Sequence, residues 1–168
     1  FAGLYGNGLY KLTAGGETWQ RVSAGITNLY LYDVVSSPSF ASDQTVFAGS
    51  TYQGVLRSSD GGRSWQNPGN SGDVQFVRSL AISPGYADDQ TVFAATETGG
   101  IYKTSDGGQT WAVANTGLSE TSMAKIAVST NYVEDQTVLA GSYNGKIFRS
   151  TDGGASWIDL VAGFPDQS

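Results

Sequence analysis

The chain has 168 residues, a net charge of −6 and 39% hydrophobic residues, which are the proportions of a globular domain rather than a disordered chain. Its nine Lys and Arg residues are scattered and form no basic groove for a phosphate backbone, so nucleic acid is not an expected partner. It contains no Cys and no His, which excludes disulfides, Cys/His zinc sites and catalytic triads with an imidazole base.

The predicted elements are short strands joined by tight turns. The 23 glycines and 12% aromatic residues favour such strands, and no stretch of ten or more residues has the pattern of an amphipathic helix. In chain order, the first complete unit has an apolar strand that ends at Ser36, a turn at 37–40 and a second strand at 45–50. A hairpin leads to a third strand at 55–58, and a second turn precedes a fourth strand that opens at Trp65. The expected class is all-β.

This unit recurs every 46 residues without gaps. Three copies of Asp-Gln-Thr-Val begin at Asp43, Asp89 and Asp135, and four tryptophans follow the same period. The tryptophans are Trp19, Trp65, Trp111 and Trp157. Four short strands in about 46 residues is the size of one propeller blade. We therefore predict a β-propeller, present as a partial arc of about four four-stranded antiparallel blades.

The register also predicts where the blades begin and end. The expected blades are about 1–29, 30–75, 76–121 and 122–168, in a single propeller segment. Four full copies would need 184 residues, 16 more than the chain has, and Phe1 falls inside a second strand. Because closed propellers usually have more than four blades, we expect the chain to be part of a longer one. No run of eighteen apolar residues is present, so no membrane span is expected.

A conserved turn pattern within the repeat precedes each fourth strand. Three copies read Ser/Thr-x-Asp-Gly-Gly-x-Ser/Thr-Trp around Asp60, Asp106 and Asp152, whereas the first copy has Ala14 in place of the aspartate. The carboxylate is expected to accept hydrogen bonds from backbone N–H groups two or three residues on, and the Gly-Gly pair permits a positive φ. The tryptophan is expected to lie across the strands and pack against the next blade. These residues are therefore predicted to be structural.

The pattern resembles the Asp-box, or BNR, repeat family, over essentially all 168 residues. Relatives of this kind include sialidases, xyloglucan hydrolases, sortilin-type receptors and photosystem II assembly factors with their bacterial homologues. The Asp-Gln-Thr-Val-Phe-Ala strand is most similar to the assembly factors, whose members are largely non-enzymatic. The resemblance implies that the Asp-box lies on the hairpin between the two outer strands, away from the face that binds substrates.

Positions that differ between the copies indicate where function lies. The loops from second to third strand and from fourth to next first strand should share one face, and a specific site there should vary from blade to blade. The candidate binding residues on this loop face are Tyr30, Tyr32, Asp33, Phe76, Arg78, Glu97, Lys125 and Tyr143. Aromatic residues, arginine and mixed charge suit a protein or glycan partner. Positions that match are scaffold, such as the cation shared by Lys11, Arg57, Lys103 and Arg149.

Catalysis and metal binding are weaker interpretations. A glycosidase needs two facing carboxylates, and no spacing singles out a pair among Asp33, Asp73, Glu97 and Glu120. The Phe-Arg-Ile-Pro start typical of sialidases is absent. Adjacent acids such as Asp88-Asp89 offer oxygen ligands for calcium, but the matching Ser42-Asp43 indicates turn charges instead.

The sequence therefore predicts a non-enzymatic propeller scaffold for protein or glycan binding, in complex assembly or at a cell surface. Its other expected partners are the remaining blades of the same propeller or another copy of the chain. We expect an extracytoplasmic location and no cofactor or metal. The alternative is a sialidase-like or other glycoside hydrolase whose catalytic residues lie partly outside this segment.

Overall fold

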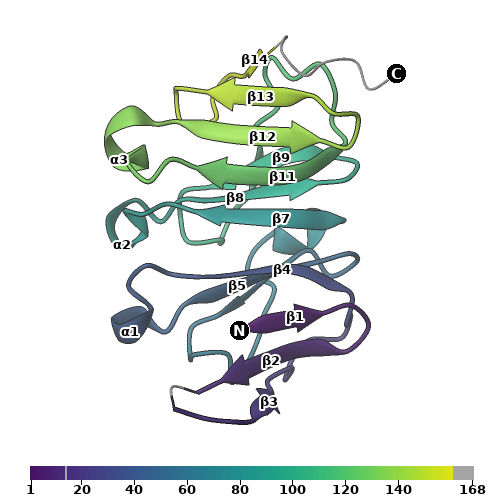
Figure 1. Cartoon of the computed structure of the whole chain (residues 1–168), viewed down its shortest axis with the longest axis vertical. Coiled ribbons are helices and arrows are strands. Elements are labelled where there is room, and N and C mark those ends of the chain that lie inside the picture. Colours follow the sequence, from purple (N-terminus) through teal and green to yellow (C-terminus); the bar gives the residue numbers. More distant parts are fainter. Residues whose placement is uncertain (14, 161–168) are drawn as a thin grey trace.

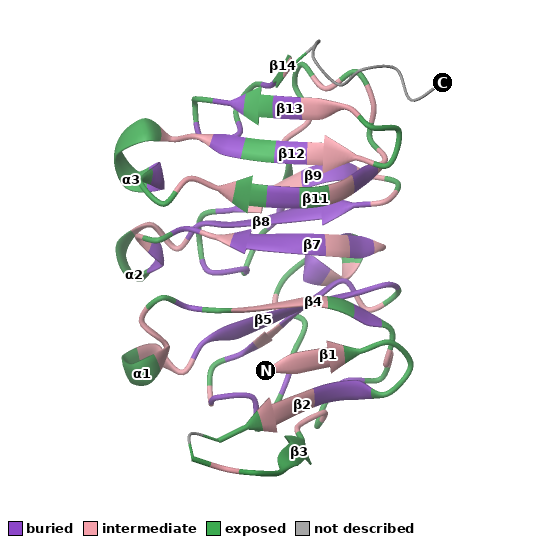
Figure 2. Ribbon diagram, viewed as in Figure 1, coloured by how far each residue is buried: buried purple, intermediate pink, exposed green. Residues whose placement is uncertain are grey.

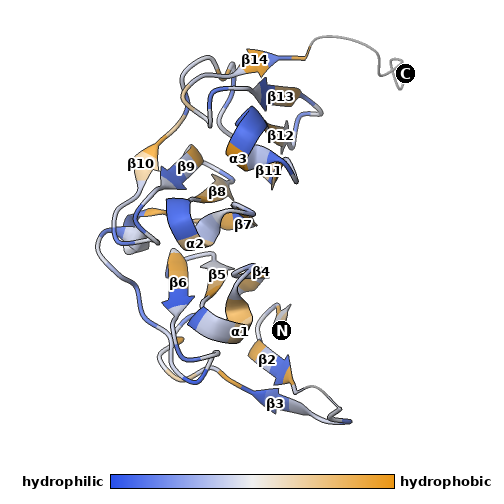
Figure 3. Cartoon of the chain, turned by 90° about the vertical axis from the view of Figure 1, so that its left-hand side faces the viewer, coloured by the Kyte–Doolittle hydropathy of each residue, from blue (hydrophilic) through white to orange (hydrophobic). Residues whose placement is uncertain are grey.

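The computed structural model describes residues 1–13 and 15–160 and confirms an all-β propeller arc. Four antiparallel sheets follow one another along a curved path (Figure 1, Figure 3). Blade 1 has β1 (Ala2–Leu4), β2 (Gly8–Leu12) and β3 (Trp19–Arg21); blade 2 has β4 (Leu31–Ser36), β5 (Val46–Ser50) and β6 (Val55–Ser58). Blade 3 has β7 (Val77–Ile82), β8 (Val92–Thr96), β9 (Gly100–Thr104) and β10 (Ala112–Val113). Blade 4 has β11 (Met123–Val128), β12 (Val138–Ser142), β13 (Ile147–Ser150) and β14 (Ile158–Asp159).

Two sheets depart from four strands. Blade 1 begins at a second strand, as the register predicts. In blade 2 the fourth strand is reduced to one bridge between Arg57 and Gln66, and the chain then turns into a short 3-10 helix, η1 (Ser71–Asp73). Pro68 explains the loss, because proline has no N–H to donate to a sheet ladder.

A single helical turn joins the first strand to the second in blades 2, 3 and 4, where the sequence predicted only a turn. These helices are α1 (Phe40–Asp43), α2 (Tyr86–Asp89) and α3 (Tyr132–Asp135), and they lie along one edge of the arc (Figure 1). Each ends at a glutamine in the left-handed region, with φ of 50–52°. The preceding aspartate then accepts two bonds: Asp43 accepts one from the Ser37 hydroxyl at 2.5 Å and one from the Thr45 amide at 2.8 Å. The repeated Asp-Gln-Thr segment therefore ends the helix and starts the second strand.

The Asp-box turns are closed by their own side chains. The Asp60 Oδ1 accepts the amide of Ser64 at 3.0 Å, and the same bond to the residue four positions on recurs at Asp106 and Asp152. The amide three residues on, that of Arg63 in this turn, also interacts with the carboxylate and lowers its pKa, as the sequence predicted, while the donor four residues on lies just beyond the predicted range. The hydroxyl of Ser58 donates to Asp60 and accepts the Gly62 amide at 2.8 Å. Ala14, the exception in the first copy, lies outside the described residues.

The tryptophans pack backwards along the chain, not forwards as the sequence analysis expected. Trp65 of blade 2 donates through Nε1 to the Val22 carbonyl of blade 1 at 2.8 Å, and Trp157 of blade 4 donates to Ala114 in the segment that follows β10 of blade 3. Each of the three buried tryptophans belongs to a core cluster that also contains residues of the preceding blade. Trp19 is 51% exposed, against 3–5% for its three equivalents, because no sheet precedes it in the described chain.

The helical elements of the described residues are all short. None is long and apolar enough to cross a membrane.

Candidate binding surface

The divergent positions meet in pairs on the edge opposite the helices. In blade 3 the Glu97 amide donates to the Phe76 carbonyl at 3.0 Å, and in blade 4 the Tyr143 amide donates to the Ser122 carbonyl at 3.1 Å. In blade 2 the Thr51 amide donates likewise to the Tyr30 carbonyl. Each of these bonds joins the loop after the second strand to the start of the inner strand. The structure thus brings the predicted residues Phe76 and Glu97 together, although they are far apart in the sequence.

Five aromatic side chains and one arginine gather at this edge in two contacting groups, which together we call the aromatic–arginine patch. It comes from blades 1, 2 and 3 and consists of Tyr5, Tyr30, Tyr32, Tyr52, Phe76 and Arg78. The Tyr5 ring lies 4.8 Å from that of Tyr30 and 5.4 Å from that of Tyr32, and Tyr52 meets Phe76 edge-on at 5.4 Å. All four tyrosines remain exposed. A group of large, rigid rings in contact with water is typical of a recognition surface.

Arg78 links the patch to a carboxylate. Its guanidinium carbon lies 3.9 Å from the centre of the Tyr32 ring, and its Nε donates to Glu97 at 2.9 Å. Burial alone would lower the pKa of Arg78, but the bonds to Glu97 and Tyr32 outweigh this effect and raise it. The guanidinium is therefore held flat against the Tyr32 ring by the ion pair, in a cation–π geometry.

Phe76 is the strained residue of the patch. Its φ of +55° lies in the left-handed region, which residues other than glycine rarely adopt. The conformation is fixed by two backbone bonds, one from the Phe76 amide to the Thr51 carbonyl at 2.7 Å and one from the Glu97 amide to the Phe76 carbonyl. Backbone strain of this kind is concentrated at sites where a side chain must be aimed in one direction. Here it directs the ring onto Tyr52.

Four of the predicted binding residues lie outside the patch, namely Asp33, Glu97, Lys125 and Tyr143, although Glu97 pairs with Arg78 of the patch. Asp33 accepts the Ser79 hydroxyl at 3.1 Å and the Leu80 amide at 2.8 Å, so it joins blades 2 and 3 and is structural. Lys125 lies on the face of blade 4, and Tyr143 is exposed on the loop after β12. Tyr52 was missed, although its equivalents Gly6, Thr98 and Asn144 differ from it and from one another. The comparison of copies could therefore have found it.

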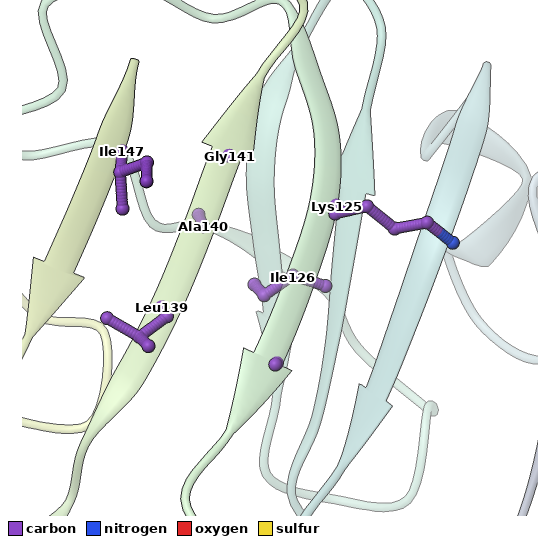
Figure 4. Close-up of a pocket in the computed structure, with 7 residues that line it drawn as sticks. Lys125, Ile126, Leu139, Ala140, Gly141 and Ile147 are labelled. Carbon is purple, nitrogen blue, oxygen red and sulfur yellow. The ribbon is translucent and has the colours of Figure 1, made fainter. Parts of the chain in front are cut away.

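One face of blade 4 is apolar and exposed. A hollow of about 350 Å³ is lined by Lys125, Ile126, Ala127, Leu139, Ala140, Gly141 and Ile147, and the Lys125 side chain extends away from Leu139 and Ile147 (Figure 4). Leu139 is 43% exposed, whereas its equivalents Phe47 and Phe93 are fully buried beneath the next blade. Figure 2 shows the same contrast between β12 and the buried strand β8.

Three of the four acidic side chains considered for catalysis, those of Asp33, Glu97 and Glu120, are engaged in bonds. Glu97 pairs with Arg78, and Glu120 accepts a hydrogen bond from the Asn144 amide group at 2.6 Å, which lowers the pKa of Glu120. Wherever a carboxyl pKa is shifted in the described chain, it is lowered. The described residues also contain no group of three or more acidic side chains placed to hold a metal ion.

The fold, the 46-residue period and the Asp-box turns together define an Asp-box β-propeller chain. The family model described as Sortilin, neurotensin receptor 3, matches residues 53–166, which is more than half of the chain, and the chain belongs to this Sortilin-Vps10 family. The comparison with curated proteins finds no match.

Solved structures with a similar fold have different functions. An ancestral GH74 enzyme superposes with a TM-score of 0.74 at 24% identity, over 98% of this chain and 22% of that one. YCF48 bound to a D1 peptide gives 0.56 at 18% identity, over 77% and 40%. The extracellular domain of a hybrid two-component system from B. thetaiotaomicron gives 0.68 at 17% identity, over 96% and 20%. The chain thus spans less than half of each of these structures, and identities this low establish the fold alone.

Proposed function

We propose that this chain is a non-enzymatic binding module and that the aromatic–arginine patch holds a segment of a partner protein. The observation that carries the proposal is the patch itself: the exposed rings of Tyr5, Tyr30 and Tyr32 from blades 1 and 2 in contact with one another, with Arg78 of blade 3 held across Tyr32 by Glu97. Tyrosine and arginine contribute large contact areas at low entropic cost and dominate the energetics of protein interfaces. YCF48, a propeller of similar fold, is known in a structure with a D1 peptide bound.

A glycan is the second candidate ligand, because exposed rings can stack on sugar faces as well as on peptide groups. The guanidinium favours a protein segment. It is already paired with Glu97, so its remaining donors and the Tyr32 ring together present a mixed polar and aromatic surface, which matches peptide carbonyls and side chains.

The competing function is glycoside hydrolysis, the activity of the GH74 neighbours. Hydrolysis needs a general acid whose pKa is raised, together with a second carboxylate about 5–10 Å away. In the described part of the chain, every carboxyl group with a shifted pKa has that pKa lowered. Glu97 pairs with Arg78, and Glu120 accepts a hydrogen bond from Asn144. These features support binding without catalysis.

Binding and hydrolysis are separated by one set of measurements. A displayed peptide library and an oligosaccharide array are each probed with the wild-type chain and with the variants Tyr32→Ala and Arg78→Gln. Arg21→Gln, which removes one positive charge on β3 away from the patch, is the matched control. We expect selected peptides to lose about tenfold or more in affinity with the first two variants and nothing with Arg21→Gln. Release of new reducing ends from any oligosaccharide would replace this proposal with the hydrolase.

We further propose an extracytoplasmic location. The extracellular domains of two-component systems from B. thetaiotaomicron have this fold, which supports a module exposed outside the cytoplasm. Fractionation of a producing cell, with detection of the chain in the periplasmic, surface or secreted fraction, tests the location directly.

We also propose that a second copy of this chain covers the apolar face of blade 4. The three internal junctions show what this face accepts, namely a blade whose tryptophan packs back onto it. At the other end of the arc, blade 1 exposes Trp19 in the equivalent place. The two ends are thus complementary, and a head-to-tail contact between copies would repeat the internal junction.

A further inference from the structure

The junction between blades 2 and 3 differs from the other two junctions in its repeated cation. Lys11 of blade 1 donates to the Gly61 carbonyl of blade 2 at 2.9 Å, and Lys103 of blade 3 donates to the Gly153 carbonyl of blade 4 at 2.8 Å. The equivalent residue in blade 2 is Arg57, and among the described residues it makes no such bond to Gly107. Its Nε is buried without a hydrogen-bond partner. Arg57, predicted to be a scaffold cation, therefore lacks the carbonyl contact that the lysines make at the other two junctions.

Two more polar atoms at the same junction lack a protein partner. The indole Nε1 of Trp111 has no acceptor, whereas those of Trp65 and Trp157 each donate to a carbonyl at 2.8 Å. The Tyr86 hydroxyl lies near Arg57, which opposes the effect of burial on the pKa of Tyr86, but it forms no hydrogen bond of standard geometry, and Tyr86 and Trp111 are more than nine-tenths buried. The equivalent carbonyl for Trp111 would be that of Pro68, in the segment where the fourth strand is lost. Buried donors that lack an acceptor are costly, and no carbonyl of the chain accepts from the Arg57 Nε or from the Trp111 Nε1 at this junction.

A polar cavity opens at this junction, on the outer rim and on the Asp-box side of the arc. It has a volume of about 250 Å³ and is lined by Arg57, Ser59, Ser64, Gln66, Pro68 and Gln109. The equivalent cavity one repeat later has Lys103 in the place of Arg57. It has alanines, Ala112, Ala114 and Ala155, in the places of Gln66, Pro68 and Gln109. Two of the three alanines are replaced by glutamine amides and the third by proline, and an engaged lysine is replaced by an arginine. The copies therefore differ in the way expected of a specific site.

We propose that this cavity binds a small oxyanion, a carboxylate or a phosphate group, through the Arg57 guanidinium. A guanidinium presents parallel N–H donors that match two oxygens of such a group, and the lining amides and hydroxyls add further donors. Asp60 is the acidic residue of the adjoining turn. Its oxygens accept bonds from Ser58 and Ser64, so its charge is directed into its own turn rather than into the cavity.

The test is a nuclear magnetic resonance titration of the chain. Sodium phosphate and sodium acetate are added separately at constant ionic strength, with sodium chloride as the reference, and the Arg57 Nε–H and Trp111 Nε1–H resonances are followed. We expect a saturable shift of the Arg57 resonance with phosphate, with acetate or with both, and none with chloride. A response to phosphate alone identifies a phosphate site, and a response to acetate alone identifies a carboxylate site. No saturable shift with either salt overturns the proposal and leaves the cavity to water.

The repeat supplies the variants. Arg57→Lys installs the residue that the neighbouring junctions carry, and Gln109→Ala installs the residue found at Ala155, so both are compatible with the fold. We expect Arg57→Lys to weaken binding by about tenfold or more, because the two-pronged contact is lost. Arg149→Lys, the same change in blade 4, should leave the affinity unchanged. Binding by Arg57→Lys that equals the wild type would contradict the proposal.

Discussion

Tyr32 and Tyr5 report directly on the aromatic–arginine patch through their ionisation. Burial opposes ionisation of Tyr32, but Arg78, Tyr5 and Thr51 outweigh it and lower the pKa of Tyr32, whereas the bond to Tyr32 raises the pKa of Tyr5. We expect an alkaline titration to show Tyr32 ionising before Tyr5. Arg78→Gln should raise the pKa of Tyr32, and Arg21→Gln should leave it in place. A Tyr32 pKa that is unchanged in Arg78→Gln would mean that the two side chains are not in contact in solution.

Asp60 and Asp152 make the folding stability of the chain fall at acidic pH. Bonds from Ser64 and from Ser156 lead the interactions that lower the pKa of each aspartate to about 2. A carboxyl group whose pKa is depressed on folding contributes stability above its unfolded pKa, near 4, and loses that contribution as the pH falls towards 2. We expect the melting temperature to fall over this window. Asp60→Asn should make the fall shallower, and Asp60→Ala should cost about 1–2 kcal/mol at pH 7 in denaturant unfolding. An unchanged acid profile in Asp60→Asn would exclude this carboxylate as a source.

At the scale of the element, the tryptophan after each Asp-box is the residue that joins one blade to the one before it. Trp157 is 3% exposed and packs against blade 3, whereas Trp19 has the same place in the repeat and is 51% exposed. We expect Trp157→Ala to lower the free energy of unfolding by about 3–5 kcal/mol. Trp19→Ala should change it by less than about 0.5 kcal/mol, as is usual for surface positions. Equal costs at the two positions would show that the tryptophan acts within its own blade instead.

The strands were predictable because the same residue pattern recurs in every copy of the repeat. The departures from this pattern are local. The fourth strand of blade 2 fails where Asn67-Pro68-Gly69 replaces the Val113-Ala114-Asn115 of blade 3, a difference that the sequence displays. The backward packing of the tryptophans was not predictable. A period fixes which residue recurs but not which neighbour it faces, since both neighbours carry the same residues. The helical turns were likewise hidden, because they depend on a left-handed glutamine backbone at Gln44 and its equivalents.

At the scale of the whole molecule, the candidate surface was predictable in its residues but not in its contacts. Divergence between copies selected Tyr32, Phe76, Arg78 and Glu97, and all four lie together. The contact between Arg78 and Tyr32 crosses from blade 3 to blade 2, so it depends on the rotation between blades, which the spacing of residues does not encode. The contacts of Asp33 were hidden for the same reason, because its partners Ser79 and Leu80 belong to the next blade.

The two ends of the arc determine how the isolated chain behaves in solution. Blade 4 exposes Leu139 over an apolar hollow of about 350 Å³, and blade 1 exposes Trp19 on the complementary side. Apolar faces of this kind drive association, so sedimentation of the wild-type chain should show a mass that rises with concentration above 17.6 kDa. Leu139→Asp should sediment as the monomer, while Val133→Asp, a charge added at an exposed residue of α3, should associate as the wild type does. A wild-type chain that stays monomeric at every concentration would mean that a second copy does not cover this face, and the head-to-tail contact would have to be abandoned.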